Sequence, residues 1–137
     1  MNRINELNIV KYYYNPYSNR IEIFKENRNK SGVYCWYNIS NKKLYIGSSI
    51  NITNRLYCYF SYKYLENEIL KSQSLIYRSI LKYDYIHFDL IILKYCNTNE
   101  LLYWEQYFID KIIPEYNILK KVRSNLRFKH LSVNCHY

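Results

Sequence analysis

Alternating and continuous apolar runs in the middle of the chain predict three β-strands. β-favouring residues occupy 33–37 and 44–46, on either side of the turn-like stretch 40–43, which is the pattern of an antiparallel hairpin. Residues 86–93 alternate at first and then become wholly apolar, as in a central strand that is covered on both faces. Together these segments predict a three-stranded antiparallel sheet.

Helical periodicity fills the segments between and after these strands. Asn51 is a candidate N-cap, and apolar residues then recur every four positions over 52–60. A second helical pattern covers about 74–83, and a third covers about 97–113, which opens with an arrangement like a capping box. Strands and helices together predict a small α/β (α+β) domain in which helices flank the sheet.

One carboxylate lies within the apolar stripe of the third predicted helix. Glu105 follows Leu101 by four positions and precedes Phe108 by three, so its side chain points toward the core. Burying an unpaired carboxylate costs on the order of several kcal/mol, so such a group should be paired, protonated or bound to a metal. The sequence leaves open a metal site and an ordinary buried ion pair with a basic residue.

Charge and residue usage favour a polyanionic partner and an AT-rich gene. The net charge of +9 favours nucleic acid, because neutralising phosphates releases condensed counterions. The chain has no Ala and only two Gly and two Pro, while Ile, Asn, Lys and Tyr are abundant, and their codons indicate AT-rich DNA, as in organelles. The apolar runs are too short to cross a bilayer, and the four cysteines lack the paired spacing of structural zinc, so neither membrane nor zinc is expected.

Two tripeptides on the predicted hairpin carry a family resemblance. Gly32-Val33-Tyr34 and Tyr45-Ile46-Gly47, ten residues apart, resemble the paired motifs of the GIY-YIG nucleases, with Val in place of the first Ile. That family then has an Arg in the next helix, a Glu in a later helix and an Asn soon after. Arg55, Glu105 and Asn117 take these places, so the resemblance covers most of the predicted domain.

The resemblance extends to the homing endonucleases that mitochondrial group I introns encode. The stretches 25–32, 45–49 and 114–119 are similar to that group, and 128–130 resembles the opening of its C-terminal DNA-binding region, which we expect to be truncated here. The resemblance implies a metal-dependent DNA endonuclease of intron homing, located in the mitochondrion. The alternative is a catalytically inactive nucleic-acid-binding remnant or an intron-splicing helper.

The resemblance also implies the roles of the site residues in phosphodiester hydrolysis. Glu105 would hold one Mg²⁺ or Mn²⁺ ion, and Arg55 would place its guanidinium on the phosphate. Tyr45 is the candidate general base, with Tyr34 second, and neighbouring cations must lower the phenol pKa for this role. The predicted catalytic set is Tyr34, Tyr45, Arg55, Tyr59, Glu105 and Asn117. The site should lie on the sheet surface against the first and third predicted helices.

Several of these residues also have a structural interpretation. Tyrosines on strands, such as Tyr34 and Tyr45, are more often core residues than functional ones. Tyr59 stands where some family members have His, and either phosphate contact or packing would explain it. Asn117 could act at the site or could tie down the backbone after Pro114 through a turn-type side-chain bond.

The chain is expected to divide into an N-terminal extension, 1–30, a nuclease domain, 31–120, and a basic tail, 121–137. Basic residues without an acidic neighbour near its C-terminus could form a DNA-binding strap or a solvated end. These candidate DNA-binding residues are Lys120, Lys121, Arg123, Arg127 and Lys129. The expected partner is double-stranded DNA, with no small-molecule cofactor.

Overall fold

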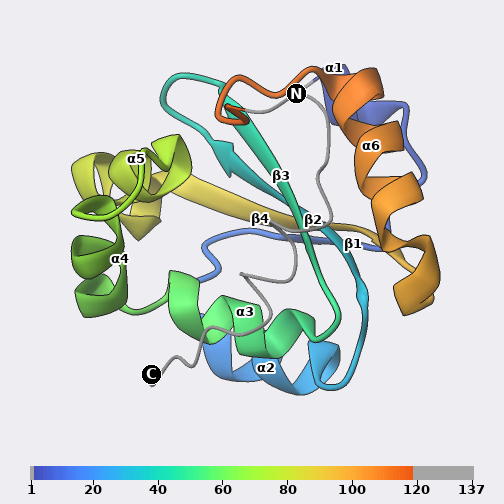
Figure 1. Cartoon of the computed structure of the whole chain (residues 1–137), viewed down its shortest axis with the longest axis horizontal. Coiled ribbons are helices and arrows are strands. Elements are labelled where there is room, and N and C mark those ends of the chain that lie inside the picture. Colours follow the sequence, from blue (N-terminus) through green and yellow to red (C-terminus); the bar gives the residue numbers. More distant parts are fainter. Residues whose placement is uncertain (1, 119–137) are drawn as a thin grey trace.

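The computed structural model describes residues 2–118 and has an antiparallel sheet at its centre (Figure 1). Its strands are β1 (Lys11–Tyr13), β2 (Gly32–Asn38), β3 (Leu44–Ser49) and β4 (Phe88–Tyr95). They lie in the order β1-β4-β2-β3, and each neighbouring pair is antiparallel. The predicted hairpin, the predicted central strand and the α+β class are therefore confirmed.

The sheet has four strands, whereas the sequence predicts three. The additional strand, β1, lies within residues 1–30, which were expected to form an extension, and it pairs with β4 so that Lys11 faces Ile92 and Tyr13 faces Leu90. Three residues are too few to show the alternation on which strand prediction depends. The correction adds an edge strand and places β4 in the interior of the sheet.

Helices surround the sheet, and three of them match the predicted ones. The helices are α1 (Asn2–Asn5), α2 (Arg20–Asn27), α3 (Ile52–Tyr59), α4 (Tyr62–Ile69), α5 (Leu75–Tyr83) and α6 (Leu101–Ile112), with the 3-10 turns η1 (Tyr85–His87) and η2 (Thr98–Glu100). Asn51 caps α3, as predicted, by accepting a hydrogen bond from the Asn54 amide. Within residues 2–118, no helix combines the length and apolar character needed to cross a membrane.

The helices divide between the two faces of the sheet. Tyr34 and Trp36 of β2 point into a core that α2, α3, α4 and α5 cover. Val33 and Cys35, which alternate with them, point into a second core that α6 and α1 cover. The result is a layered arrangement in which α6 lies on the far side of the sheet from α3 (Figure 1).

The N-terminal residues contribute to both cores. Ile23 and Phe24 of α2 are buried in the core on the α3 side, and Ile4 of α1 is buried on the α6 side. Arg3 also donates from Nη1 to the Ile112 carbonyl oxygen at 3.3 Å. A cation at this point satisfies a carbonyl that the end of α6 leaves without a helical partner. The elements α1, β1 and α2 are thus part of the packed domain.

The substitution Ile23→Ala tests this packing of the N-terminal residues. Ile23 is fully buried, so we expect the free energy of unfolding, measured by urea denaturation, to fall by about 2–5 kcal/mol. Ile21 lies on the same helix and is 60% exposed, so Ile21→Ala should change it by less than about 0.5 kcal/mol. Equally small effects of the two substitutions would show that α2 is not part of the cooperative unit.

Candidate active site

Tyr34 of β2 lies across the neighbouring edge strand because that strand carries a glycine opposite it. Tyr34 pairs with Gly47 of β3 in the strand register. A Cβ atom at Gly47 would lie 2.5 Å from the hydroxyl oxygen of Tyr34 and 2.7 Å from its Cζ, which is closer than these atoms can approach. Gly47 therefore leaves the space that the buried Tyr34 ring occupies, and Tyr45 packs against the same core.

The chain's other glycine has a similar steric role. A Cβ atom at Gly32 would lie 2.2 Å from the carbonyl oxygen of Lys94 on β4. Gly32 thus allows the start of β2 to approach β4, next to a register shift between Val33 and Tyr34. At both glycines of this sequence, atoms of a neighbouring strand lie too close for a Cβ atom, and both glycines belong to the tripeptide motifs.

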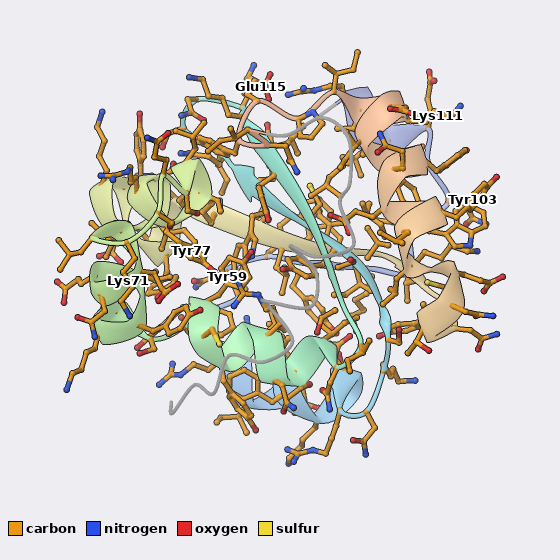
Figure 2. All side chains as sticks on the ribbon, in the orientation of Figure 1. Tyr59, Lys71, Tyr77, Tyr103, Lys111 and Glu115 are labelled. Carbon is orange, nitrogen blue, oxygen red and sulfur yellow. The ribbon has the colours of Figure 1, made fainter. Side chains whose placement is uncertain are left out.

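Arg55 places a buried cation on the same face. It lies in the first turn of α3 and is 5% exposed, and its guanidinium stands over the Tyr59 ring at 5.0 Å from the centroid. Its Nη2 donates to the hydroxyl of Tyr77 on α5, and its Nη1 has no hydrogen-bond partner among residues 2–118. Figure 2 shows Tyr59 and Tyr77 close together, with ring centroids 5.5 Å apart. An unpartnered N–H on a buried cation favours an anionic ligand.

The site phenols have raised pKa values, contrary to the expectation for a general base. Burial raises the pKa of Tyr34 to about 12, although Arg55 and the hydrogen bond to the Tyr59 hydroxyl, at 3.1 Å, lower it in part. Burial, Tyr34 and Glu105 raise the pKa of Tyr45 well above its ordinary value, and Arg55 lowers it by less. Desolvation of the charged form therefore outweighs the nearby cation at both residues.

Glu105 approaches the two tyrosines from the edge of the sheet. The sequence places the site against both α3 and α6, but these helices lie on opposite faces, so that expectation is wrong. Glu105 lies beside the edge strand β3, where its Oε1 accepts a hydrogen bond from Ser48 Oγ at 2.5 Å. Its charge contributes to the raised pKa of both Tyr34 and Tyr45.

The oxygen donors at this edge suit one hard divalent cation. Between residues 2 and 118 there is no group of three or more His, Cys, Asp or Glu side chains that could hold a metal ion. Glu105 would therefore be a single carboxylate ligand, and it is half-buried, so that water and phosphate can reach it. Mg²⁺ commonly binds through one or two carboxylates while it keeps water and substrate phosphate in its coordination sphere. The donor set fits Mg²⁺ or Mn²⁺.

Asn117 uses its side-chain amide to brace the edge strand. Its Oδ1 accepts from the Ile46 amide at 2.9 Å, and its Nδ2 donates to the Ile46 carbonyl oxygen at 2.9 Å. Asn117 is buried, and Ile46 lies between Tyr45 and Gly47. Of the two interpretations of Asn117, the structural one describes these contacts, although the backbone that it holds is β3 rather than the segment after Pro114.

Two residues at the site were missing from the predicted set. Tyr77 lies within the second predicted helix, over about 74–83, and its ring is buried, but its hydroxyl reaches Arg55. Ser48 directly follows the second tripeptide, and this position is the only sequence signal for it. The predicted DNA-binding residues Lys120, Lys121, Arg123, Arg127 and Lys129, and the tail 121–137, lie outside the described residues.

Comparisons with known proteins agree on this region. A family model described as the GIY-YIG catalytic domain matches residues 30–124. Among solved structures, a point mutant of the catalytic domain of intron endonuclease I-TevI superposes with a TM-score of 0.54 and 26% sequence identity, covering 68% of this chain and 97% of that one. The family model and the structural comparison thus both match this chain to a catalytic domain of the same kind.

Curated relatives extend the similarity to longer proteins. The probable intron-encoded endonuclease bI1 of Neurospora crassa is 31% identical over 144 residues, which cover 96% of this chain and 31% of that protein. The UvrABC system protein C of Campylobacter jejuni is 29% identical over 109 residues, which cover 77% of this chain and 17% of that protein. The chain therefore spans less than a third of the length of these relatives.

The substitution Asn117→Ala tests the brace on β3. It leaves the buried amide and carbonyl of Ile46 unpaired, and each unsatisfied group costs about 1–3 kcal/mol, so the free energy of unfolding should fall by about 2 kcal/mol or more. Ile118→Ala removes an exposed neighbouring side chain and is the control, with an expected change below about 0.5 kcal/mol. Thermal and urea unfolding measure both variants, and equal stability would contradict the brace.

Proposed function

The chain belongs to the GIY-YIG family of catalytic domains, and on that premise we propose that it is an endonuclease that hydrolyses phosphodiester bonds in double-stranded DNA. Family membership confirms the resemblance carried by the two tripeptides. The observation that carries the proposal is the buried guanidinium of Arg55, whose Nη1 has no partner among residues 2–118. A DNA phosphate supplies the charge and the acceptor that this group lacks.

Arg55 and Glu105 divide the recognition of the phosphate between them. The guanidinium of Arg55 would donate to a phosphoryl oxygen and stabilise the charge that grows there during hydrolysis. Glu105 would hold Mg²⁺ or Mn²⁺, and this ion supplies Lewis acidity at the phosphate and lowers the pKa of a nearby phenol when it is bound. Ser48 orients the carboxylate by donating to its Oε1. On this proposal, the scissile bond would lie between the buried cation and the edge carboxylate.

Tyr45 is the proposed proton acceptor from the attacking water. Tyr45 is half-buried, whereas Tyr34 is only 1% exposed, so Tyr45 is the more accessible of the two, and the charge of Glu105 acts on it. The hydroxyl of Tyr34 hydrogen-bonds with that of Tyr59, which suits a positioning or relay role. Burial raises the pKa of Tyr45 well above its ordinary value, so a nearby cation would have to lower that pKa for Tyr45 to act as the base.

Mitochondrial intron homing is the proposed biological role. It is supported by the relative from Neurospora crassa, whose name describes a probable intron-encoded endonuclease, and by the residue usage that indicates an AT-rich gene. If the chain bound duplex DNA but did not cut it in the presence of Mg²⁺, the alternative from the sequence analysis would apply, which is a catalytically inactive nucleic-acid-binding remnant.

The substitution Glu105→Gln should abolish plasmid nicking and leave DNA affinity and the fold intact. Gln keeps an acceptor for Ser48 but loses the anionic metal ligand. Asp110→Asn removes a carboxylate from the exposed side of the same helix and should cut at the wild-type rate. A chelator should stop both wild type and Asp110→Asn, and their activity should return with excess Mg²⁺. Full activity of Glu105→Gln would remove Glu105 from the metal site.

The two tyrosine hydroxyls should differ in their effect on the chemical step. General-base catalysis contributes roughly 10²–10⁴-fold, so Tyr45→Phe should slow single-turnover cleavage by at least about a hundredfold. Tyr34→Phe should slow it by less, because Tyr34 is not exposed to the attacking water. Both variants keep the aromatic ring, and unfolding measurements check that each remains folded. A larger loss in Tyr34→Phe would transfer the role of base to Tyr34.

A further inference from the structure

We propose that Tyr77 is a positioning residue that aims Arg55 at the DNA phosphate, an inference that rests on the proposed endonuclease function. Tyr77 is 4% exposed, and its hydroxyl accepts a hydrogen bond from Nη2 of Arg55. It lies on α5, outside the tripeptide motifs and outside the helix that carries Arg55. Its position therefore reflects tertiary packing, and its polar atom is directed at a functional side chain.

The contacts of Arg55 hold one arm of its guanidinium and leave the other arm, which is buried, without a hydrogen-bond partner among residues 2–118. The group stands over the ring of Tyr59 at 5.0 Å and near the ring of Tyr77 at 5.7 Å from the centroid. Because the guanidinium is a rigid planar fork, holding Nη2 on the Tyr77 hydroxyl also sets the direction of Nη1. Nη1 is the arm without a partner among the described residues, so the phenol determines where that arm points.

A phenol is better suited to this task than a carboxylate. A carboxylate would hold Arg55 more strongly, but it would also neutralise the charge that the phosphate needs. Across residues 2–118, the ion pairs involve Arg3, Lys11 and Lys71, and none involves Arg55. Tyr77 thus orients the guanidinium through a neutral acceptor, without a carboxylate counter-charge among the described residues.

Tyr77 is itself held in place by the start of α5. Ser74 is the N-cap of this helix, and its Oγ accepts from the Tyr77 amide at 3.3 Å. Ile76 and Ile80 on the same helix are buried in the core that α3 shares. Arg55 lies in the first turn of α3, so the capped ends of two helices meet at this hydrogen bond.

The substitution Tyr77→Phe removes the hydroxyl and keeps the ring. We expect single-turnover cleavage in Mg²⁺ to slow by about 10- to 100-fold, because a misplacement near 1 Å can cost about 10²-fold. Duplex affinity should not change, since most of it comes from other phosphate contacts. Tyr83→Phe on the same helix is the matched control, because Tyr83 is half-buried in the same core, and it should cut at the wild-type rate. An unchanged rate in Tyr77→Phe would overturn the proposal.

Two further measurements separate positioning from a general structural effect. In an Arg55→Lys background, Tyr77→Phe should cost little more, because a residue that acts through Arg55 loses its effect once Arg55 is changed. Independently, NMR of the arginine side chains should show separate Nη resonances for Arg55 in wild type and averaged ones in Tyr77→Phe, since the hydrogen bond blocks rotation of the guanidinium.

The outcomes distinguish this proposal from the proposed function. Additive losses in the double variant, or separate Arg55 resonances that persist in Tyr77→Phe, would overturn the positioning role. A wild-type chain that cuts no DNA would count against the endonuclease function instead, and the Arg55 resonances would then decide the role of Tyr77 without reference to cleavage.

Discussion

The burial of the Arg55 guanidinium without a carboxylate partner among residues 2–118 is the constraint on which the site depends. A buried charge with no compensation costs on the order of several kcal/mol. Here phenol oxygens and aromatic faces compensate it: Tyr77 accepts from it, and the Tyr59 ring lies beneath it. Tyr59 in turn contacts Tyr34, whose ring fits over Gly47. A series of direct contacts thus links Gly47 of the second tripeptide to Arg55 of α3.

The parts of the fold that could be predicted from the sequence are those that local patterns encode. The hairpin that carries the two motifs, the capped helix after Asn51 and the central strand over 88–95 all have strong periodicity or turn signals. Glu105 could be singled out because a carboxylate interrupts the apolar stripe of the helix in which it lies. Its neighbour Ser48 carries no such conflict, and only the packing of α6 against β3 reveals it.

The features that were missed depend on contacts between distant segments. β1 is only three residues long and becomes a strand through its pairing with β4. The opposite placement of α3 and α6 follows from how the chain crosses the sheet, which helical periodicity does not record. The sequence pattern around Tyr77 is that of an ordinary core tyrosine, and its ring is indeed buried. Only the tertiary structure shows where its hydroxyl points.

The braces on the site have a consequence for the order of events during synthesis. Arg3 reaches Ile112 across 109 positions, and Asn117 pairs with Ile46 across 71. Such contacts form late, because long loops must close before they contribute stability. On the ribosome, the strand that carries Tyr45 emerges long before residue 117, so its edge has no brace during that interval. The segment around Tyr45 therefore completes its edge contacts only after residue 117 has been synthesised and has docked.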